Sequence, residues 1–520
     1  MAEQQSSAFV QAARESISDS IYVPITHTLP LNGVAPDLTL VVAEKEYLAS
    51  AINFLIRDGY IKRRDGYTTR VGVDSTATVA MHTITEWTPY DGSARVVMAT
   101  PTRFYYYSPD TWNDITTTAR AGIRADPIFF TPMRTSNNAI RLVSVNGTDP
   151  PCWWSGATNS AFVVLSTAVI GTCVTVWRSH LLQGDTTDTA DGKVSSRVHW
   201  SALGDPTVWT GTASAGSLDL IDANASKVMV FQPLRNTLLA YKAEAVHSLT
   251  YRASPLYFTQ NVLHGSLTLF APRCVAPVNG GEQHFVFTQE GSILWDGQGI
   301  KAIGRNRVDQ TIFRAISWAD RKRTWTYYSP NTREVFLSIP TSAGVDRLWV
   351  YHLDTDSWWE TDLDILGMYT VVQATSSAFT SPAVLCGASD GAAIYQLFTG
   401  ASDSTASAAI SASFQTGYYN YGAVEHKGIF KMGIIGSPGS GTSATISLSK
   451  AGTENPLILP TFADAQTLTL TGGNHFPKID FRLTDRWISY RLTHSGAGES
   501  LTVSELIPSL TQRSDARKRR

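Results

Sequence analysis

A short internal repeat constrains the fold of this chain more than any other feature. The hexapeptide EGSILW at residues 290–295 returns as DGAAIY at residues 390–395, and in both copies a glycine turn precedes a strand that ends on an aromatic residue. The copies start 100 residues apart, a distance that holds two repeats of about 50 residues. Repeated hairpins of this size are typical of β-propeller blades, since a single blade cannot bury both faces without neighbours in a ring.

A second repeat indicates the same kind of unit. YYSPDT at residues 106–111 returns as YYSPNT at residues 327–332, and a looser copy, VYHLDT at residues 350–355, precedes Trp358 and Trp359. Each copy predicts a hairpin in which an aromatic strand leads into a turn formed by proline, aspartate or asparagine. We therefore predict an all-β chain with a β-propeller of about six or seven blades over residues 90–400.

The remaining segments read differently. Residues 1–89 are expected to form an extended N-terminal arm and first strands that serve docking or closure. A small polar stretch at residues 401–407 marks a boundary, and alternating strands over residues 401–512 predict a β-sandwich-like domain. Residues 513–520 form a basic tail. The most apolar run, residues 161–177, falls short of the ~20 apolar residues of a membrane span, so we expect no membrane insertion and predict two buried strands joined by a turn at residues 170–172.

Composition excludes several functional classes. A formal net charge of −2 and only 17% charged residues argue against a protein coated with basic residues for nonspecific nucleic-acid binding. The four cysteines form no CxxC pair, which excludes a sequence-evident zinc ribbon or disulfide framework and fits a reducing compartment. No phosphate loop, dinucleotide fingerprint, HExxH helix or GxSxG elbow occurs, so no cofactor is expected.

Two acidic groups are weak candidates for chemistry. Asp185, Asp188 and Asp191 faintly resemble a calcium loop, but their spacing departs from the EF-hand pattern and a flexible surface turn is favoured. A second group surrounds Trp358 and Trp359 and could hold a glycosidase-like carboxylate pair; side chains that shape turns are the favoured interpretation. This group consists of Asp354, Asp356, Glu360, Asp362 and Asp364. We predict no catalytic, cofactor-binding or metal-binding residue, and no enzyme.

Two basic clusters remain, both interrupted by acidic residues. They are either a docking surface for an acidic partner or a phosphate backbone, or solvated strand edges whose charge discourages pairing, and the second interpretation is favoured. The first cluster contains Arg57, Lys62, Arg63, Arg64 and Arg70, and the second contains Lys301, Arg305, Arg307, Arg314, Arg321, Lys322 and Arg323.

Several motifs resemble one known family. An Asn-containing strand (AINFL, residues 51–55) is followed by Arg-x-Gly-aromatic at residues 64–67, and residues 197–209 read RVHWSALGDPTVW. The strand pair at residues 238–249, then FVFTQEG at 285–291 and WDG at 295–297, continue the pattern. Over roughly residues 20–400 the chain resembles the tail nozzle proteins of short-tailed bacteriophages, a group that includes the packaged-DNA stabilisation and tail tubular B proteins. Independently of that resemblance, Trp200 and Trp209 can clamp the Gly-Asp-Pro turn between them by burying their aromatic faces.

The resemblance implies a structural virion protein rather than an enzyme. Copies of such a subunit form a ring, a hexamer in this family, below the portal and adaptor proteins, and tail fibre or tip proteins attach to it. The ring closes the DNA exit channel, retains the packaged genome and opens for ejection. Duplex DNA passes between subunits without sequence recognition. The protein would be located in the virion tail after assembly in the host cytoplasm. The alternatives are a propeller that binds or hydrolyses glycans in a tail, and a generic propeller scaffold.

Overall fold

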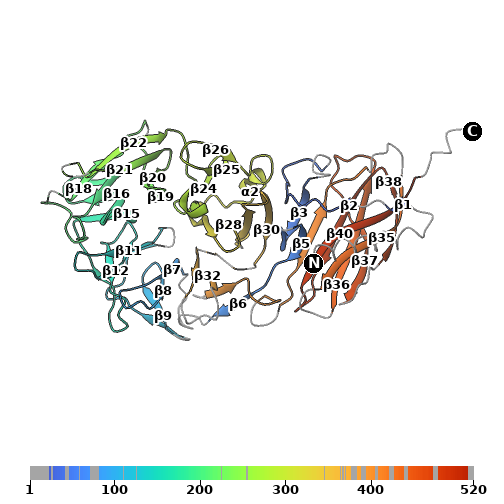
Figure 1. Ribbon diagram of the computed structural model, residues 1–520, viewed down its shortest axis with the longest axis horizontal. Coiled ribbons are helices and arrows are strands. Elements are labelled where there is room, and N and C mark those ends of the chain that lie inside the picture. The colour runs from blue at the N-terminus through green and yellow to red at the C-terminus, as the bar shows by residue number, and fades with distance from the viewer. Residues whose placement is uncertain are drawn as a thin grey trace, which may run out of the picture.

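The computed structural model of the chain is built almost entirely from strands, arranged in two lobes along the longest axis (Figure 1). The structure describes residues 23–24, 27–40, 46–57, 59–70, 81–108, 111–123, 126–212, 214–223, 225–252, 254, 256–344, 346–363, 365, 368, 370–375, 383–387, 394–403, 408–420, 427–438, 443–471 and 478–512. One lobe is a ring of four-stranded sheets, and the other is a pair of stacked sheets.

Seven four-stranded antiparallel blades make up the ring within the described part of the chain. Blades 1 to 4 consist of β7 (Thr83–Trp87), β8 (Arg95–Ala99), β9 (Phe104–Ser108) and β10 (Thr111–Asp114); β11 (Phe129–Arg134), β12 (Ile140–Val145), β13 (Cys152–Trp154) and β14 (Val163–Val164); β15 (Val169–Trp177), β16 (His180–Asp188), β17 (Gly192–Trp200) and β18 (Gly216–Asp219); and β19 (Val228–Leu234), β20 (Thr237–Lys242), β21 (Val246–Tyr251) and β22 (Phe258–His264). Blades 5 to 7 consist of β23 (Val275–Val278), β24 (Gln283–Thr288), β25 (Gly291–Trp295) and β26 (Ile300–Ala302); β27 (Trp325–Ser329), β28 (Glu334–Ile339), β29 (Arg347–His352) and β30 (Ser357–Thr361); and β31 (Thr370–Ala374), β32 (Ala383–Gly387), β33 (Ile394–Leu397) and β6 (Tyr67–Arg70). The first strand of each blade contacts the first strands of both neighbours, and β31 contacts β7, so the ring is closed and the predicted propeller is confirmed.

The last blade is completed by a strand from the other end of the chain. Its outer strand, β6, pairs antiparallel with β33, so that Tyr67 lies opposite Leu397. The rings of Tyr67 and Tyr395 meet edge to face with centroids 5.4 Å apart. The first blade in turn begins at Thr83, ahead of residue 90. The segment expected as an N-terminal arm, residues 1–89, therefore contributes strands to both lobes.

The internal repeats correspond to hairpins of the propeller. EGSILW forms the β24–β25 turn and the third strand of blade 5, and the described end of DGAAIY, Ile394 and Tyr395, begins the third strand of blade 7. This places the copies two blades apart, as predicted. The described residues of YYSPDT, 106–108 and 111, belong to the paired strands β9 and β10, whereas YYSPNT forms the β27–β28 hairpin, so these copies occupy different positions within their blades.

The turn predicted at residues 170–172, within the apolar run 161–177, is absent. Residues 170–172 lie inside β15, and β14 and β15 do not pair but belong to blades 2 and 3. Gly171 serves close packing instead: a Cβ at this position would lie 2.6 Å from the Cβ atom of Gln183 on β16. Strand β14 is not buried either, since Val163 and Val164 are 48% and 55% exposed.

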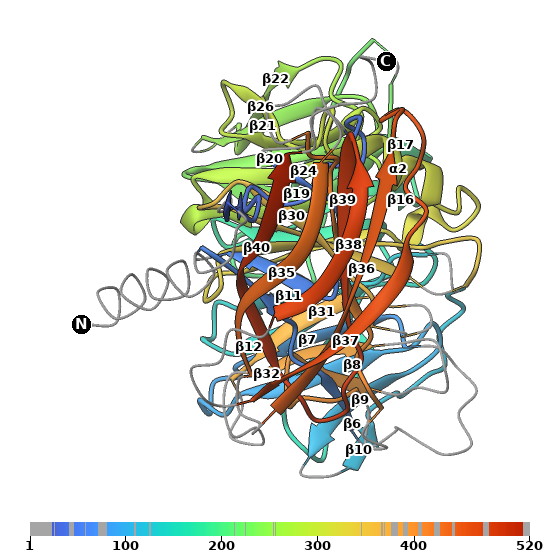
Figure 2. The ribbon, with the colours of Figure 1, turned by 90° about the vertical axis from the view of Figure 1, so that its right-hand side faces the viewer.

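The second lobe is a β-sandwich formed by strands from both ends of the chain, and Figure 2 shows it face on. One sheet has the order β38 (Lys478–Asp485), β35 (Lys427–Pro438), β40 (Leu501–Gln512), β5 (Tyr60–Arg63) and β4 (Phe54–Arg57), with β1 (Val23–Pro24) and β2 (His27–Thr28) paired to β40. The other continues from β30 of blade 6 through β3 (Leu48–Ile52), β34 (Ala412–Thr416), β39 (Trp487–His494), β36 (Ser443–Thr453) and β37 (Ala463–Thr471). The expected sandwich is thus present, and its second sheet is continuous with the propeller.

A single apolar core crosses the boundary between the lobes. Inward residues of the sandwich, such as Met432 of β35 and Ile446 of β36, belong to the same buried cluster as Trp358 of blade 6 and Phe285 of blade 5. Alternation of apolar and polar residues along β36 produces this inward face. Between blades 5 and 6 the chain forms a short helix, α2 (Asp309–Ala315). None of the helices in the described residues is long and apolar enough to cross a membrane.

Candidate functional site at the joint of the two lobes

Arg64 is the centre of the joint between propeller and sandwich. The residue follows β5 and is 2% exposed. Its Nη1 and Nη2 atoms donate to the two carboxylate oxygens of Asp403 at 2.7 and 2.6 Å. Nε donates to Asn53 Oδ1 at 2.7 Å, and the remaining bonds reach the carbonyl oxygens of Asp65 and Asp362. A guanidinium has five N–H donors, and here all five are used.

Asn53 organises the opposite side of the same joint. It lies between β3 and β4 in a left-handed conformation (φ 60°), which asparagine tolerates better than most residues. Its Oδ1 accepts from Arg64 and from the backbone N–H of Asp362, while Nδ2 donates to the carbonyl oxygen of Ser411 at 2.7 Å. One side chain therefore ties the N-terminal strands to the end of blade 6 and to the start of β34.

The remaining motif residues fit the same joint. Gly66 lies against Ser402, whose carbonyl oxygen would be 1.8 Å from a Cβ at position 66, so no larger residue fits without a backbone shift. Tyr67 begins β6 and closes the propeller. Arg63, 1% exposed, donates to the carbonyl oxygens of Ala401 and Gly496. The Asn-strand and Arg-x-Gly-aromatic pattern singled out in the sequence is therefore the pattern of this joint.

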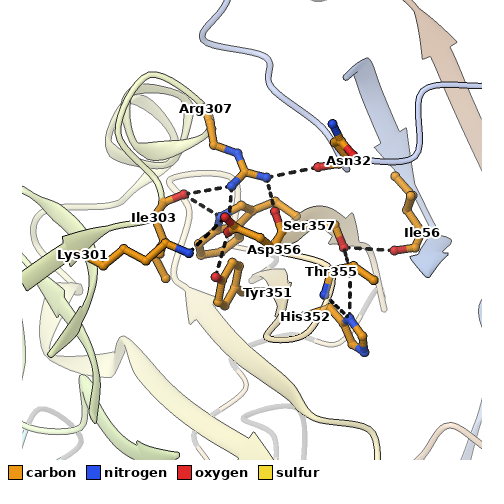
Figure 3. A network of polar contacts seen from close by, with 11 residues as sticks. Asn32, Ile56, Lys301, Ile303, Arg307, Tyr351, His352, Thr355, Asp356 and Ser357 are labelled. Atoms are coloured by element: carbon orange, nitrogen blue, oxygen red, sulfur yellow. Dashed lines mark hydrogen bonds and ion pairs between the residues drawn. The ribbon is translucent and has the colours of Figure 1, made fainter. Parts of the chain in front are cut away.

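A second polar network holds the N-terminal arm against blade 6 (Figure 3). The guanidinium of Arg307, just before α2, donates to Asp356 Oδ1 at 3.0 Å and to the carbonyl oxygen of Asn32 at 3.1 Å. Lys301 and Tyr351 also donate to the Asp356 carboxylate, at 3.1 and 2.8 Å. Burial opposes ionisation of Asp356, but these hydrogen bonds and the charge of Arg307 hold its pKa below the usual value.

The same arm reaches the helix and the sandwich. Asp37 Oδ1 accepts from the backbone N–H and hydroxyl of Thr311, and its Oδ2 accepts from the N–H of Gln310, so the arm caps the first turn of α2. Ser357 Oγ donates to the carbonyl oxygen of Ile56 on β4 at 3.0 Å. Blade 6 is thus held by the arm on one side and by the sandwich on the other.

The Trp200–Trp209 loop joins three blades. Trp200 packs edge to face on Phe258 of blade 4, with ring centroids 5.1 Å apart. Trp209 enters a different cluster, which contains Met133 of blade 2. Between them the carbonyl oxygen of Gly204 accepts from Ser136 N–H of blade 2 at 2.8 Å. The loop is clamped by its two tryptophans as expected, and it also fastens blade 3 to both neighbours.

Arg273 crosses the axis of the propeller. Its side chain starts at blade 5 and donates to the carbonyl oxygens of His82 (3.1 Å) and Ile128 (2.9 Å) and to the hydroxyl of Thr83, which belong to the starts of blades 1 and 2. A cavity of about 210 Å³ remains beside it, lined by residues of the inner strands. No local pattern marks Arg273 in the sequence, because its partners lie about 145–190 positions away.

The carboxylates near the paired tryptophans are engaged in other contacts. Asp354 binds Arg333 at 2.7 Å, and Glu360 lies 3.2 Å from Arg347. Burial raises the pKa of Glu360, and the charge of Arg347 opposes that rise. Trp358 and Trp359 are fully buried, so they offer no stacking surface to a sugar. Asp364 lies outside the described residues.

The favoured interpretation of the basic clusters is wrong for Arg63 and Arg64, which are buried rather than solvated. Carbonyl oxygens and a carboxylate from segments more than 290 positions away make this burial possible. In the second cluster Lys301 and Arg307 hold Asp356, and Arg323 binds both oxygens of Asp346. Arg305, Arg321 and Lys322 are exposed, as expected. The side chain of Arg70 and the basic tail, residues 513–520, lie outside the described residues.

The expected acidic surface turn is present at residues 189–191, which are exposed, but Asp185 does not belong to it. Asp185 lies at a bulge within β16, 5% exposed, where Lys193 approaches it to 2.8 Å. Asp188 and Asp191 bind the guanidinium of Arg197. Among the residues that the structure describes, no group of three or more His, Cys, Asp or Glu side chains is placed to hold a metal ion. The four cysteines are free and buried, and burial raises the pKa of Cys152 to about 12.

Comparisons with known proteins add little to this geometry. No protein-family model matches the chain, and no curated protein matches its sequence. One similar solved structure is BBS1N in complex with ARL6DN, with 8% identity, a TM-score of 0.41 and coverage of 65% of this chain and 99% of that chain. Another is the extracellular domain of a putative one component system, BT4673, from B. thetaiotaomicron, with 9% identity, a TM-score of 0.41 and coverage of 70% of this chain and 42% of that chain.

Proposed function

We propose that this chain is a structural subunit of the tail of a short-tailed bacteriophage, and that a ring of its copies forms the nozzle that retains packaged DNA and opens for ejection. The observation that supports the proposal most is the joint around Arg64. The residues that carry the resemblance to nozzle proteins, Asn53, Arg64 and Gly66, are the residues that meet there. A subunit that resists the outward force of packaged DNA needs lobes that do not separate, and this joint supplies that stiffness.

The propeller axis bears on where DNA would pass. Arg273 spans the axis, and the cavity of about 210 Å³ beside it equals a disc only about 2 Å thick if it were about 12 Å across, the width of the major groove of a duplex alone. In a ring of subunits the duplex would therefore run along the symmetry axis between copies. A net charge of −2 suits such a wall, because strong phosphate contacts would slow the exit of DNA.

The proposal places the protein in the virion tail, after assembly in the host cytoplasm, in contact with an adaptor or portal above and a fibre or tip protein below. Opening would then be a change between two states of the ring, biased by contacts at the tail tip. The glycan-hydrolase alternative receives less support, since the tryptophans are buried and Asp354, Asp356 and Glu360 each face a cation.

Immunogold electron microscopy of particles from the source tests this function directly. An antibody raised against residues 408–510 should label the distal end of a short tail in intact, DNA-filled particles. Antibody pre-absorbed with the purified protein serves as the control and should leave the tails unlabelled. Absence of label on all particles, with an antibody that binds the native protein, would overturn the proposal, and label confined to heads would do the same.

A second test links the joint to genome retention. Particles that carry Arg64→Lys should release their DNA at a lower temperature than wild-type particles, because an ammonium cannot make the five bonds of the guanidinium. The matched control is Arg103→Lys, since Arg103 forms an exposed ion pair with Asp114 in blade 1. Equal release temperatures for the two variants would contradict the role of the joint.

A further inference from the structure

A pocket of about 290 Å³ lies between the connection from blade 4 to blade 5 and the outer strands of blade 5. Its wall includes Thr268 from that connection, Glu290 and Ser292 from the β24–β25 hairpin, and Arg305 and Asp309 from the segment that leads into α2. None of these residues takes part in the joint around Arg64. The pocket is therefore a separate feature of the propeller rim, and it does not depend on the proposed role in a phage tail.

Asp309 supplies a buried carboxylate to this pocket. The residue is only 6% exposed. Its Oδ1 accepts from the backbone N–H and the hydroxyl of Ser292, at 3.1 and 3.0 Å. No described residue donates a hydrogen bond to Oδ2. The protein therefore occupies Oδ1, and Oδ2 keeps its capacity to accept a hydrogen bond from a bound molecule.

Two glycines leave room for this carboxylate. A Cβ at Gly291 would lie 2.2 Å from Asp309 Oδ2, and a Cβ at Gly304 would lie 2.1 Å from Oδ1. Gly291 also has a positive φ of 132°, so two properties of the site favour glycine there. The carboxylate is held in a fixed position by its surroundings rather than lying at the edge of a flexible loop.

Three side chains set the charge of the pocket wall. Glu290 adds a negative charge and Arg305 a positive one, which together with Asp309 leaves the wall with one net negative charge. A primary ammonium carries one positive charge and three N–H donors, so it matches both this charge and the carboxylate oxygen that no described residue contacts as a donor.

We propose that this pocket binds a primary ammonium group, either the side chain of a lysine on a partner protein or a free alkylamine. Asp309 Oδ2 accepts a hydrogen bond from it, and its stem lies along the apolar wall formed by Leu267, Ile293 and Ile300. Lysine side chains bury such stems readily while the charged end finds acceptors.

The titration of Asp309 fits this role. Burial raises its pKa to about 6, against the hydrogen bonds from Ser292, and the nearby charge of Asp37 raises it further. The other titratable and charged groups that face the pocket are Glu290, Arg305 and His264. A bound ammonium would favour the ionised carboxylate and lower its pKa. Amine binding should therefore be strong at pH 7.5 and weak at pH 5, where Asp309 is mostly protonated.

Calorimetry with the full chain tests the proposal. At pH 7.5, n-butylammonium should bind, and tetramethylammonium, which has no N–H donor, should not. Asp309→Asn should weaken n-butylammonium binding at least tenfold, whereas the control Asp464→Asn, at an exposed site on β37, should leave it unchanged. Nα-acetyl-lysinamide distinguishes the two sources, because it binds if the pocket admits a lysine of a partner and fails if only a free amine fits.

A second variant keeps the test decisive if Asp309→Asn does not fold. Glu290→Gln, at an exposed position, removes one of the two carboxylates of the wall and its net negative charge, so it should weaken binding about three- to tenfold. Binding of n-butylammonium that is the same in wild type and in both folded variants would overturn the proposal. Equal binding of tetramethylammonium, or of n-butylammonium at pH 5 and 7.5, would overturn it as well.

Discussion

Arg64 and Lys242 are both buried cations that pair with an aspartate, yet the sequence separation between cation and partner differs widely between the two pairs. Arg64 meets Asp403, 339 positions away, where the two lobes join. Lys242 is fully buried in blade 4 and meets Asp222 at 2.7 Å and the carbonyl oxygen of Leu220, 22 positions away. His247 completes this second cluster, and the charge of Lys242 adds to burial in lowering the pKa of His247.

The contrast shows how side-chain geometry matches the task. A planar guanidinium with five donors suits the joint, where a carboxylate, an amide and two carbonyl groups approach from several directions. An ammonium is a compact charge, and at the boundary of blades 3 and 4 it has fewer partners to satisfy. The same chemistry therefore fastens two lobes in one place and two neighbouring blades in the other.

Arg64→Ala should produce the largest effect. It removes five hydrogen bonds and leaves the carboxylate of Asp403 buried without its cation, so we expect a loss of about 3–5 kcal/mol in the free energy of unfolding. Urea titration followed by tryptophan fluorescence measures this loss. The stability of Arg64→Lys should fall between those of wild type and Arg64→Ala. A loss of less than about 1 kcal/mol for Arg64→Ala would contradict the view that Arg64 stabilises the joint more than Lys242 stabilises its cluster.

Acid should act on the propeller through His284, next to the blade 4 cluster. Burial lowers the pKa of this histidine to about 4, while Tyr241 and the carbonyl oxygen of Pro233 hold its ring. The unfolded chain takes up the proton near pH 6.5 and the folded chain near pH 4, so stability falls as pH decreases across that window, by up to ~3 kcal/mol.

Unfolding free energies at several pH values between 7 and 4 measure this slope. His284→Gln should reduce it, while buried His247 keeps its own contribution, and His264→Gln, at a half-buried site on β22, should leave it unchanged. If His284→Gln and wild type show the same slope, the buried histidine is not the source of acid sensitivity.

Lys242→Met should cost less than Arg64→Ala. Asp222 loses its cation but keeps hydrogen bonds from Ser226 N–H and Oγ at 3.1 and 3.0 Å, so we expect a loss of about 2 kcal/mol. Adding Asp222→Asn should recover much of this loss, because the double variant no longer buries an unpaired charge. Thermal and urea unfolding of the two single variants and the double variant complete the cycle, and strict additivity would contradict the pairing.

Gly66→Ala should have the smallest effect at the joint. The new Cβ would meet the carbonyl oxygen of Ser402, and the local shift should cost about 1–3 kcal/mol. Gly265→Ala is the matched control, because nothing lies within 4 Å of its Cβ position. Melting temperatures of both variants measure this cost, and equal values would show that the joint has room for a methyl group at residue 66.

The sequence predicts the blades better than it predicts their closure. Glycine turns and aromatic strand ends are local signals, and the 100-residue spacing of two such hairpins corresponds to blades 5 and 7. The strand that completes blade 7 comes from residues 67–70, however, and a pairing with Ile394 or Leu397 leaves no local pattern in either segment. For the same reason the N-terminal strands of the sandwich could not be assigned to it.

The joint was visible in the sequence only as a resemblance. Asn53 and Arg64 belong to the motif that was singled out, yet the charges around Arg64 were interpreted as solvated. The burial of a cation depends on what surrounds it, and here Asp403 and the carbonyl oxygen of Asp362 arrive from far along the chain. No local pattern marks Asp309, because the residues that hold its carboxylate are two glycines and a serine, which carry no charge.

Pairing between strands β5 and β40 also implies a long delay between the translation of the first strand and that of its partner. Residues 60–63 leave the ribosome early, whereas their partners Thr502 and Val503 emerge about 440 residues later. At ~5–20 residues per second, the first strands wait roughly 20–90 seconds with a free edge. During that interval the nascent chain depends on chaperones or on its own charged residues, such as Lys62 and Arg63, to avoid premature pairing. Strand β40 ends this exposure when it pairs with β5.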